Sequence, residues 1–283
     1  MEIELANVGR LMACCWDSAE SNLRILVAQK HPSPSEELIT ALFAGEFRTE
    51  IAKASSAGKV ERAFLNDVRT AIPDLDLEIV QRASGLVARV NLPNRWHEGH
   101  LSAADISVVV RRPIVDLAFG GRRVEFHRDH ATGLLAQAKL GQPVKQAKGT
   151  RKWNHMTLPQ ERLYPKRRKY YSLLLYRLNG PKANELEAFR WQLCSEFTLK
   201  KVKSWLVSDI FPDEISSSEV LTRLFARTIG TEDPKIIETI IDPKANDVHS
   251  IDLQIFWPDD GGPPPSVELH QEHQAQSLQV IQQ

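Results

Sequence analysis

The sequence predicts a mixed α/β fold, and two observations support this prediction. First, segments with helical periodicity and short apolar segments of strand type follow one another along the first 180 residues. Second, two of the strand-type segments bring charged or amide side chains into otherwise apolar runs. With 283 residues, of which 42% are hydrophobic, the chain can bury a sizeable core.

The first strong helix is expected after an N-terminal extension, residues 1–33, in which we predict one strand over residues 23–27. Residues 33–36, Ser-Pro-Ser-Glu, have the form of a capping box with proline at the first helical position. Apolar residues then recur at helical spacing: Leu38, Ile39, Leu42, Phe43, Phe47 and Ile51. On this helix Glu46 and Glu50 project inside the apolar arc, so we expect them to face the core or its edge.

The central segment, residues 34–180, contains the other predicted elements of a single core. A second helix is expected over residues 60–71, ending before Pro73. The remaining predicted elements are strands over residues 86–92, 106–110 and 133–140, a basic helix over residues 159–169, and a strand over residues 170–178. The predicted order is therefore helix, strand, strand, strand, helix, strand.

Residues 181–257 are predicted to form a mainly helical C-terminal region. Helices are expected over residues 185–194 and 202–211, after the cap at Ser216, and after Pro234; a final strand is expected over residues 249–257. The last segment, residues 258–283, is rich first in proline and glycine and then in glutamine and histidine. It has too little apolar content to fold, so we predict a disordered tail.

Asp105, Gln137 and Lys139 are the polar residues that need a chemical explanation. Asp105 leads directly into the apolar strand 106–110, while Gln137 and Lys139 lie within the strand 133–140. Burying an unpaired charge is costly, so such residues are seldom tolerated without a partner. Because side chains alternate along a strand, Gln137 and Lys139 point to the same side, away from Ala136 and Ala138.

The order of the elements, with an acid before the second strand and Gln-x-Lys on the third, resembles the core of the PD-(D/E)xK nuclease superfamily. Glutamine in place of the third-strand acid is similar to the Mrr-like branch of restriction endonucleases and to related anti-phage effector nucleases. The resemblance covers about residues 34–180 and implies a restriction-endonuclease-like αβββαβ core, to which the C-terminal helical region is an extension. It also implies a Mg²⁺-dependent, or Mn²⁺-dependent, endonuclease.

The resemblance assigns roles to individual residues. It implies that Asp105 is a metal ligand, that Gln137 lends a carbonyl oxygen, and that Lys139 serves the attacking water. A helix glutamate would complete the catalytic and metal set; we expect Glu46 there, with Glu50 as the second choice. Glutamine is neutral, so the remaining carboxylates matter more for holding a divalent ion, and Glu98 is a further expected ligand.

Basic residues are concentrated in the middle of a chain whose net charge is zero. Residues 139–203 contain 16 Lys or Arg, 4 Glu and no Asp. Such an asymmetry suggests a surface that binds nucleic acid, with DNA favoured over RNA. The residues expected to contact phosphates are Lys145, Lys148, Arg151, Lys152, Lys166, Arg167, Arg168 and Lys169.

Other classes of protein are disfavoured by the sequence. It has no apolar stretch long enough to cross a bilayer and no signal peptide at its start, so we expect a cytoplasmic protein without a membrane partner. Three cysteines do not form a disulfide framework or a zinc-finger pattern. His97, His100, His127 and His130 lack a recognisable set of further zinc ligands.

Three hypotheses on function remain open. The first is a metal-dependent endonuclease that cleaves DNA; the family resemblance suggests a role in bacterial anti-phage or restriction-type defence, acting as a homo-oligomer or within a defence complex. The second is a nuclease-like fold that has lost catalysis at position 137 and only binds nucleic acid or a protein. The third is a scaffold subunit whose working surface is the region after Pro181.

Overall fold

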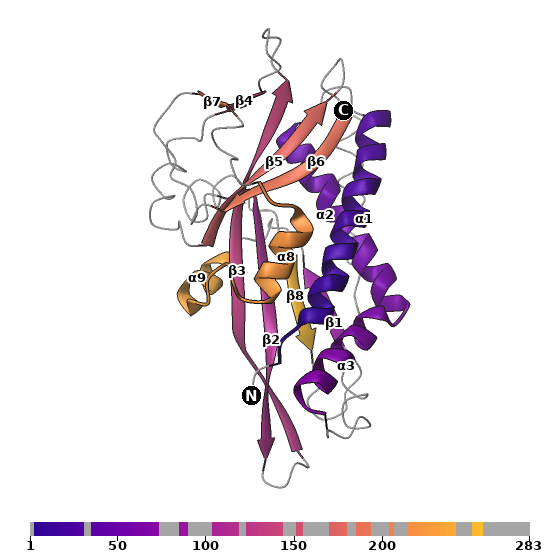
Figure 1. Ribbon diagram of the computed structural model, residues 1–283, viewed down its shortest axis with the longest axis vertical. Helices are drawn as coiled ribbons and strands as arrows, with labels where there is room; N and C mark the ends of the chain where they lie inside the picture. The colour runs from indigo at the N-terminus through magenta and orange to yellow at the C-terminus, as the bar shows by residue number, and fades with distance from the viewer. Residues whose placement is uncertain are drawn as a thin grey trace.

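The computed structural model describes residues 3–30, 35–73, 85–89, 104–118, 123–143, 151–154, 170–179, 185–193, 204–206, 214–241 and 251–256. These residues form helices and strands in a mixed α/β arrangement (Figure 1). The helices are α1 (Ala6–Lys30), α2 (Glu36–Ser56), α3 (Lys59–Ala71), α8 (Ser217–Phe225) and α9 (Pro234–Ile241). The strands are β1 (Gly85–Arg89), β2 (Ile106–Ala118), β3 (Arg123–Pro143), β4 (Arg151–Asn154), β5 (Tyr171–Asn179), β6 (Glu185–Leu193), β7 (Ser204–Leu206) and β8 (Ile251–Phe256).

The strands join in one mixed sheet whose longest member is β3. Its order is β1-β8-β2-β3-β4-β7, with β5 pairing along β3 and β6 pairing with β5. β2 and β3 are antiparallel, whereas β5 runs parallel to β3 and β8 parallel to β2. β8 thus lies between β1 and β2, so the first two strands of the chain are separated by a strand from the C-terminal part.

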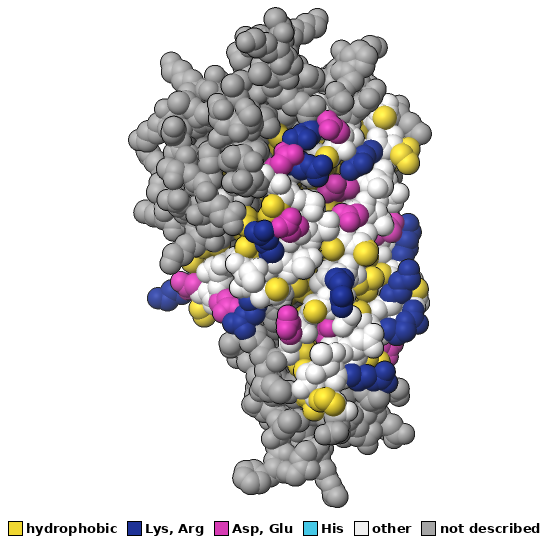
Figure 2. Space-filling view, viewed as in Figure 1, with side chains coloured by type: hydrophobic (Ala, Val, Ile, Leu, Met, Phe, Trp, Pro, Cys, Tyr) yellow, Lys and Arg dark blue, Asp and Glu magenta, His cyan; other side chains and the backbone are white. Residues whose placement is uncertain are grey.

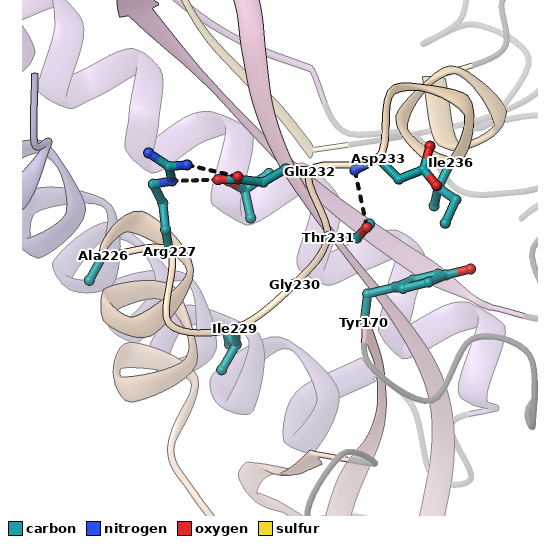
Figure 3. Close-up of a pocket in the computed structure, with 10 residues that line it drawn as sticks. Tyr170, Ala226, Arg227, Ile229, Gly230, Thr231, Glu232, Asp233 and Ile236 are labelled. Atoms are coloured by element: carbon teal, nitrogen blue, oxygen red, sulfur yellow. Dashed lines mark hydrogen bonds and ion pairs between the residues drawn. The ribbon is translucent and has the colours of Figure 1, made fainter. Parts of the chain in front are cut away.

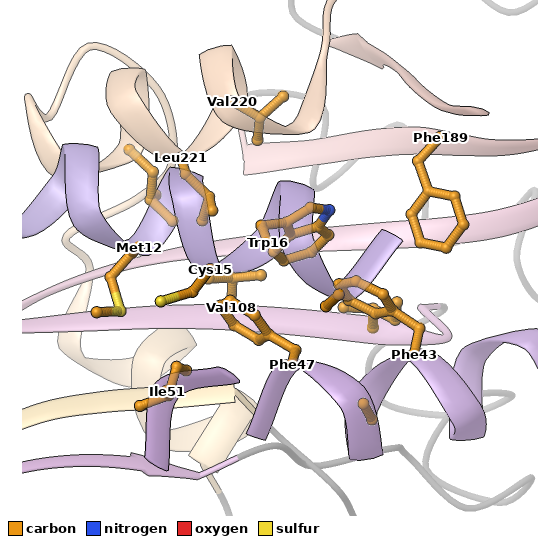
Figure 4. Packing of buried hydrophobic residues seen from close by; sticks show 14 of the residues in the cluster. Met12, Cys15, Trp16, Phe43, Phe47, Ile51, Val108, Phe189, Val220 and Leu221 are labelled. Atoms are coloured by element: carbon orange, nitrogen blue, oxygen red, sulfur yellow. The ribbon is translucent and has the colours of Figure 1, made fainter. Parts of the chain in front are cut away.

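The main hydrophobic core lies between the helices and one face of the sheet. Trp16 of α1 packs against Phe43 and Phe47 of α2, with ring centroids 4.4 and 5.1 Å apart. It also contacts Trp191 of β6 at 5.8 Å, and Phe43 contacts Phe189 at 5.0 Å. Figure 4 shows Trp16 of α1 with Phe43 and Phe47 of α2 on one side and α8 on the other. Such tilted aromatic contacts add to the burial of large apolar surfaces, so α1 belongs to the core.

Residues 23–27, predicted as a strand, lie in helix α1. Leu23 and Val27 are fully buried four residues apart, whereas Ile25 between them is 57% exposed. This spacing matches one helical face on the core and another in solvent. The β-branched residues favoured a strand, but packing against α2 outweighs this weak local preference.

Asp67 of α3 caps the beginning of α1. Its side chain is 2% exposed and accepts hydrogen bonds from the backbone N–H groups of Asn7 and Val8, at 2.8 and 3.0 Å. The first N–H groups of a helix have no partner within the helix, so a carboxylate at this position stabilises the helix N-terminus. Asp67 therefore connects α3 to α1.

The predicted helix with apolar residues from Leu38 to Ile51 and the helix predicted over residues 60–71 are confirmed as α2 and α3. The capping residue of α2 is Ser35 rather than Ser33, since the Ser35 hydroxyl accepts from the Leu38 N–H at 3.2 Å. Glu36 is the first residue of this helix. Its carboxylate does not serve the cap and extends instead toward the sheet.

Beyond residue 180 the described residues are divided between strands and helices, and part of the predicted helix content is replaced by strands. The helix predicted over residues 185–194 is strand β6, and the segment 202–211 contains β7. Helices α8 and α9 and strand β8 confirm the other predicted elements. β6 and β8 extend the sheet made by the central segment, so this region contributes to the same layer. The helix predicted over residues 159–169 and the tail 258–283 lie outside the described residues.

Strand β2 continues past Pro113, although the strand was predicted over residues 106–110. The ladder with β3 has an irregularity between Arg112 and Ile114 and then runs on to Ala118. Proline is tolerated at such an irregularity, because its nitrogen cannot donate a hydrogen bond to the ladder and a regular pairing would need that bond.

Among the described helices, none is both long and apolar enough to span a bilayer.

Candidate active site

Asp105 and Gln137 face each other across β2 and β3. The Asp105 N–H donates to the Ala136 carbonyl at 2.9 Å, just before the ladder begins with Ile106 opposite Ala136. One Asp105 carboxylate oxygen, Oδ2, accepts from the Ala138 N–H at 2.6 Å and from the Gln137 side-chain amide. The two polar residues singled out on separate strands are therefore directly bonded.

Gln137 and Lys139 lie on the face of β3 that is opposite the main core. Ala136 and Ala138 belong to the hydrophobic cluster under the helices, and side chains alternate along the strand. Gln137 is completely buried and Lys139 is 8% exposed. The predicted alternation between the alanines and the polar pair is thus present in the structure.

Glu36, at the start of α2, is the helix carboxylate that contacts Lys139. Asp105, Gln137, Lys139 and Glu36 are called the acidic cluster below. Its Oε2 lies 3.2 Å from Lys139 Nζ, and its Oε1 accepts from the Leu140 N–H at 2.9 Å. The side chains of Lys139 and Glu36 are only 11% and 21% exposed. The ion pair is therefore largely shielded from solvent, and it fixes the lysine ammonium beside a residue 103 positions away in the sequence.

Glu46 and Glu50, expected to supply the helix carboxylate, face α1 instead. Both accept from the Asn22 side-chain amide, at 3.3 and 3.2 Å, and Glu50 also pairs with Lys53 at 2.7 Å. Glu46 lies ten residues after Glu36, which is about 15 Å along a helix. The structure therefore places Glu36, and not Glu46, beside Lys139.

The sequence pattern missed Glu36 because it was assigned to the helix cap. Its side chain was expected to return to the backbone at the helix start, as the last residue of a capping box does. Once Ser35 is the cap, Glu36 is a first-turn acid whose side chain is available to the neighbouring strand. The position of the cap was the signal that could have identified it.

One buried tyrosine contacts Gln137, and another is paired with a threonine of α2. The Tyr171 hydroxyl donates to Gln137 Oε1 at 3.4 Å, and the Tyr176 hydroxyl shares a 2.6 Å hydrogen bond with Thr40. Burial raises the pKa of Tyr176 well above its ordinary value of 10.0, against the hydrogen bond with Thr40; the charges of Asp105, Glu36 and Glu20 raise it further. Tyr176 is therefore a neutral phenol close to the acidic groups.

The other expected site residues fall mostly outside the described residues. These are Glu98, Lys145, Lys148, Lys166, Arg167, Arg168 and Lys169. Arg151 and Lys152 lie in β4, opposite Pro143 and Gln142 at the end of β3. β4 thus lies alongside the continuation of the strand that carries Lys139, and the proposed contacts of these basic residues with phosphates stay predictions.

The side chains of Glu36, Asp105 and Gln137 contain oxygen donors of the kind that a hard divalent ion prefers. Glu36 and Asp105 bring carboxylates and Gln137 brings an amide oxygen, the oxygen donors that Mg²⁺ uses together with bound waters. With Lys139 included, the cluster carries one net negative charge. Across the described part of the chain there is no group of three or more His, Cys, Asp or Glu that could hold a metal. Any ion bound here would rely on two acids and a neutral amide.

A separate pocket lies beside the middle of β3. It has a volume of about 760 Å³ and is lined by residues that include Thr132, Tyr170, Arg227 and Glu232. Figure 3 shows the Arg227 guanidinium turned toward Glu232, to which its Nη2 donates at 2.7 Å. Thr132 precedes Gln137 by five residues, or about 16 Å of strand. The pocket is therefore distinct from the acidic cluster.

No protein-family model matches the chain, and neither a curated protein nor a solved structure is significantly similar to it. The resemblance to the PD-(D/E)xK superfamily therefore stays a prediction.

Proposed function

We propose that the protein is a metal-dependent nuclease that hydrolyses phosphodiester bonds, with DNA as the preferred substrate. The observation that carries this proposal is that two polar pairs lie on nearby residues of β3: Asp105 is bonded to Gln137, and Glu36 is paired with Lys139. They come from α2, from the start of β2 and from β3. Two acids, an amide oxygen and a lysine are the kinds of group that phosphodiester hydrolysis with a divalent ion uses.

The residues divide into ligands and groups that act on the water or the phosphate. Glu36, Asp105 and Gln137 would hold Mg²⁺ or Mn²⁺, which supplies charge neutralisation at the phosphate and lowers the pKa of a bound water. The Lys139 ammonium would orient the water or stabilise the charge that develops on the phosphate oxygens. Glu36 limits where that ammonium can lie, because it holds Nζ at 3.2 Å.

Gln137 is held in place by its neighbours. Its amide donates to Asp105 while its oxygen accepts from Tyr171 at 3.4 Å. A side chain fixed at both ends loses little conformational freedom when it binds a ligand. The Asp105–Gln137 pair would therefore be preorganised for binding an ion.

One observation favours the second candidate, a nuclease-like protein that binds nucleic acid without cutting it. Gln137 is completely buried, and its hydrogen bonds are made within the protein. A buried and satisfied amide is also what a structural network requires. Cleavage assays separate this candidate from the first.

The test is cleavage of plasmid DNA, linear DNA and RNA with Mg²⁺, Mn²⁺ or EDTA. We expect metal-dependent cleavage by the wild-type protein and its loss in Asp105→Ala and Lys139→Ala variants. Cleavage that survives both substitutions would refute the assignment of the site. Salt-sensitive binding of DNA by a folded protein that never cleaves it would support the binding-only candidate.

The biological role that the family resemblance suggests is defence against phage or other foreign DNA. It belongs to the same proposal, as does assembly into a homo-oligomer or a defence complex, since cutting both strands of a duplex favours paired sites. Expression in a bacterial host should reduce phage plating, and Asp105→Ala should remove the effect. Equal plating with both forms would argue against a nuclease-based defence role.

A further inference from the structure

The sheet face that carries Gln137 and Lys139 also carries two arginines. Lys139 pairs with Leu175 of β5, and Leu175 pairs with Arg190 of β6. Two residues further along both strands, Gly141 pairs with Arg177 of β5. Paired residues in neighbouring strands point to the same side of a sheet. Arg177 and Arg190 therefore lie on the same face as Lys139, with Arg190 two strands, or about 10 Å, away.

A single carboxylate is shared between these two guanidinium groups. Glu214 Oε2 lies 2.5 Å from Arg177 Nη2, and Glu214 Oε1 lies 3.4 Å from Arg190 Nε. A second acid, Glu187, reaches only to 3.9 Å from Arg177 Nη1 and is 41% exposed. Two cations thus share one close anion, and the second acid lies at the limit of ion-pair distance.

The Arg177 guanidinium is only partly satisfied by Glu214. Among the buried side-chain nitrogen and oxygen atoms in the described part of the chain, Arg177 Nε has no hydrogen-bond partner. Nε and Nη2 form one edge of the guanidinium fork, which accepts two oxygens of one anion in the bidentate arrangement. Glu214 fills half of this edge, because its other oxygen is turned to Arg190. An unpaired buried donor is costly and therefore requires an explanation.

A phosphodiester group matches this unfilled arrangement better than the shared carboxylate does. Its two unesterified oxygens can bind Nε and Nη2 of one guanidinium together, and its negative charge suits two neighbouring guanidinium groups. The side chains of Arg177, Arg190 and Glu214 are 20%, 34% and 30% exposed, so the group is near the surface. Moving Glu214 aside would open it to an anion.

The helical face is a poorer choice for a nucleic-acid surface. Figure 2 shows basic and acidic side chains interspersed over the described residues on the side where α1 and α8 lie. A mixed surface attracts a polyanion only weakly, because the opposite charges offset each other. Arg177 and Arg190 lie instead on the sheet face that carries Lys139 of the acidic cluster.

We propose that Arg177 and Arg190 bind a backbone phosphate of the nucleic acid beside the acidic cluster, and that Glu214 occupies this site in the free protein. This inference rests on the proposed nuclease function, since it assigns the substrate contact next to Lys139. Glu214 is then a competing anion that an incoming phosphate displaces. Removing its charge strengthens substrate binding, whereas removing an arginine weakens it.

The experiment measures binding of a labelled DNA duplex to the full-length protein in EDTA, so that binding is separated from cleavage. Fluorescence anisotropy over a range of salt concentrations gives the affinity and its salt dependence. Arg190→Gln should weaken binding about tenfold, as expected for losing a hydrogen bond to a charged group. It should also reduce the slope of log affinity against log salt by about 1, the effect of one lost phosphate contact.

Arg177→Lys and Glu214→Gln complete the variant set. Arg177→Lys keeps the charge but removes the fork, so affinity should fall while the salt slope changes little. Glu214→Gln should raise the affinity. The matched control is Arg223→Gln on α8, which removes an arginine from an exposed pair with Glu219 at 2.6 Å. It should leave DNA binding unchanged.

The outcomes distinguish this inference from the proposed function. If the wild-type protein cuts DNA but the arginine variants bind it normally, the inference is overturned and the nuclease function stands. Weaker binding by Glu214→Gln also overturns it, because the ion pair would then be purely structural. If the wild-type protein binds DNA through both arginines but never cuts, the phosphate site stands and the nuclease function fails. Absence of DNA binding at low salt overturns both. Thermal unfolding of each variant verifies that it is folded. If an arginine variant does not fold, the DNA affinity of Glu214→Gln tests the inference, with higher affinity supporting it and lower affinity overturning it.

Discussion

Replacing Glu36 by glutamine is the most direct test of the site. The substitution keeps the size of the side chain and an oxygen that can accept from the Leu140 N–H, a bond of 2.9 Å. It removes the charge that faces Lys139 Nζ at 3.2 Å. The ammonium then loses its carboxylate partner while the fold around α2 is preserved.

The expected magnitude follows from the burial of this ion pair. A hydrogen bond to a charged group contributes about 1.5–3 kcal/mol to the free energy of unfolding. Because Glu36 and Lys139 keep 21% and 11% exposure, we expect Glu36→Gln to lower the free energy of unfolding by about 1–2 kcal/mol.

Cleavage by Glu36→Gln should fall by at least about 100-fold, because an acid that holds the ion and the lysine is lost.

Glu46→Gln, on the same helix, is the matched control. Glu46 accepts one hydrogen bond of 3.3 Å from Asn22, so the substitution should change the free energy of unfolding by less than about 0.5 kcal/mol. Urea unfolding and metal-dependent DNA cleavage are measured for both variants. Full cleavage by a folded Glu36→Gln protein, or loss of cleavage in Glu46→Gln alone, would refute the choice of Glu36.

Three further predictions concern stability, each measured by chemical unfolding. Asp67→Ala should lower the free energy of unfolding by about 2–3 kcal/mol, because the first N–H groups of α1 lose their acceptor; a change below about 0.5 kcal/mol would contradict this cap. Burial raises the pKa of Glu20 above its ordinary value of 4.5, against hydrogen bonds from neighbouring groups. The stability that protonated Glu20 contributes is therefore full below pH 4.5 and is lost as the pH rises through the raised pKa. The free energy of unfolding of the wild-type protein should fall relative to that of Glu20→Gln over this pH range. Plots of unfolding free energy against pH that stay parallel for the two proteins would contradict this prediction. Gly230 has a φ of +96°, and an added Cβ would lie 2.8 Å from a backbone oxygen of β3, so Gly230→Ala should destabilise by about 1–3 kcal/mol. Gly45→Ala, in open space on α2, should instead stabilise by about 0.5–1 kcal/mol, and equal effects of the two substitutions would refute the strain at Gly230.

The contrast between α8 and β6 shows what local patterns can predict. Helix α8 was predicted because Ser216 supplies a cap, and the hydroxyl does accept from the Glu219 N–H at 3.2 Å. β6 was predicted as a helix, since its glutamates, leucines and alanine are good helix formers. The alternation from Phe189 to Leu193 was the signal for a strand. Pairing with β5 satisfies its backbone and decides the outcome.

The sequence by itself determined that Asp105, Gln137 and Lys139 needed polar partners, because charges and amides within apolar strands are costly when unpaired. It also determined that Gln137 and Lys139 share one face, since that follows from the period of a strand. Only the tertiary structure decided which carboxylate joins them. Glu36 and Lys139 are 103 residues apart, and the distance between them depends on how α2 packs on the sheet. No local spacing encodes that packing, so helical periodicity pointed to Glu46 while the fold brought Glu36 to the lysine.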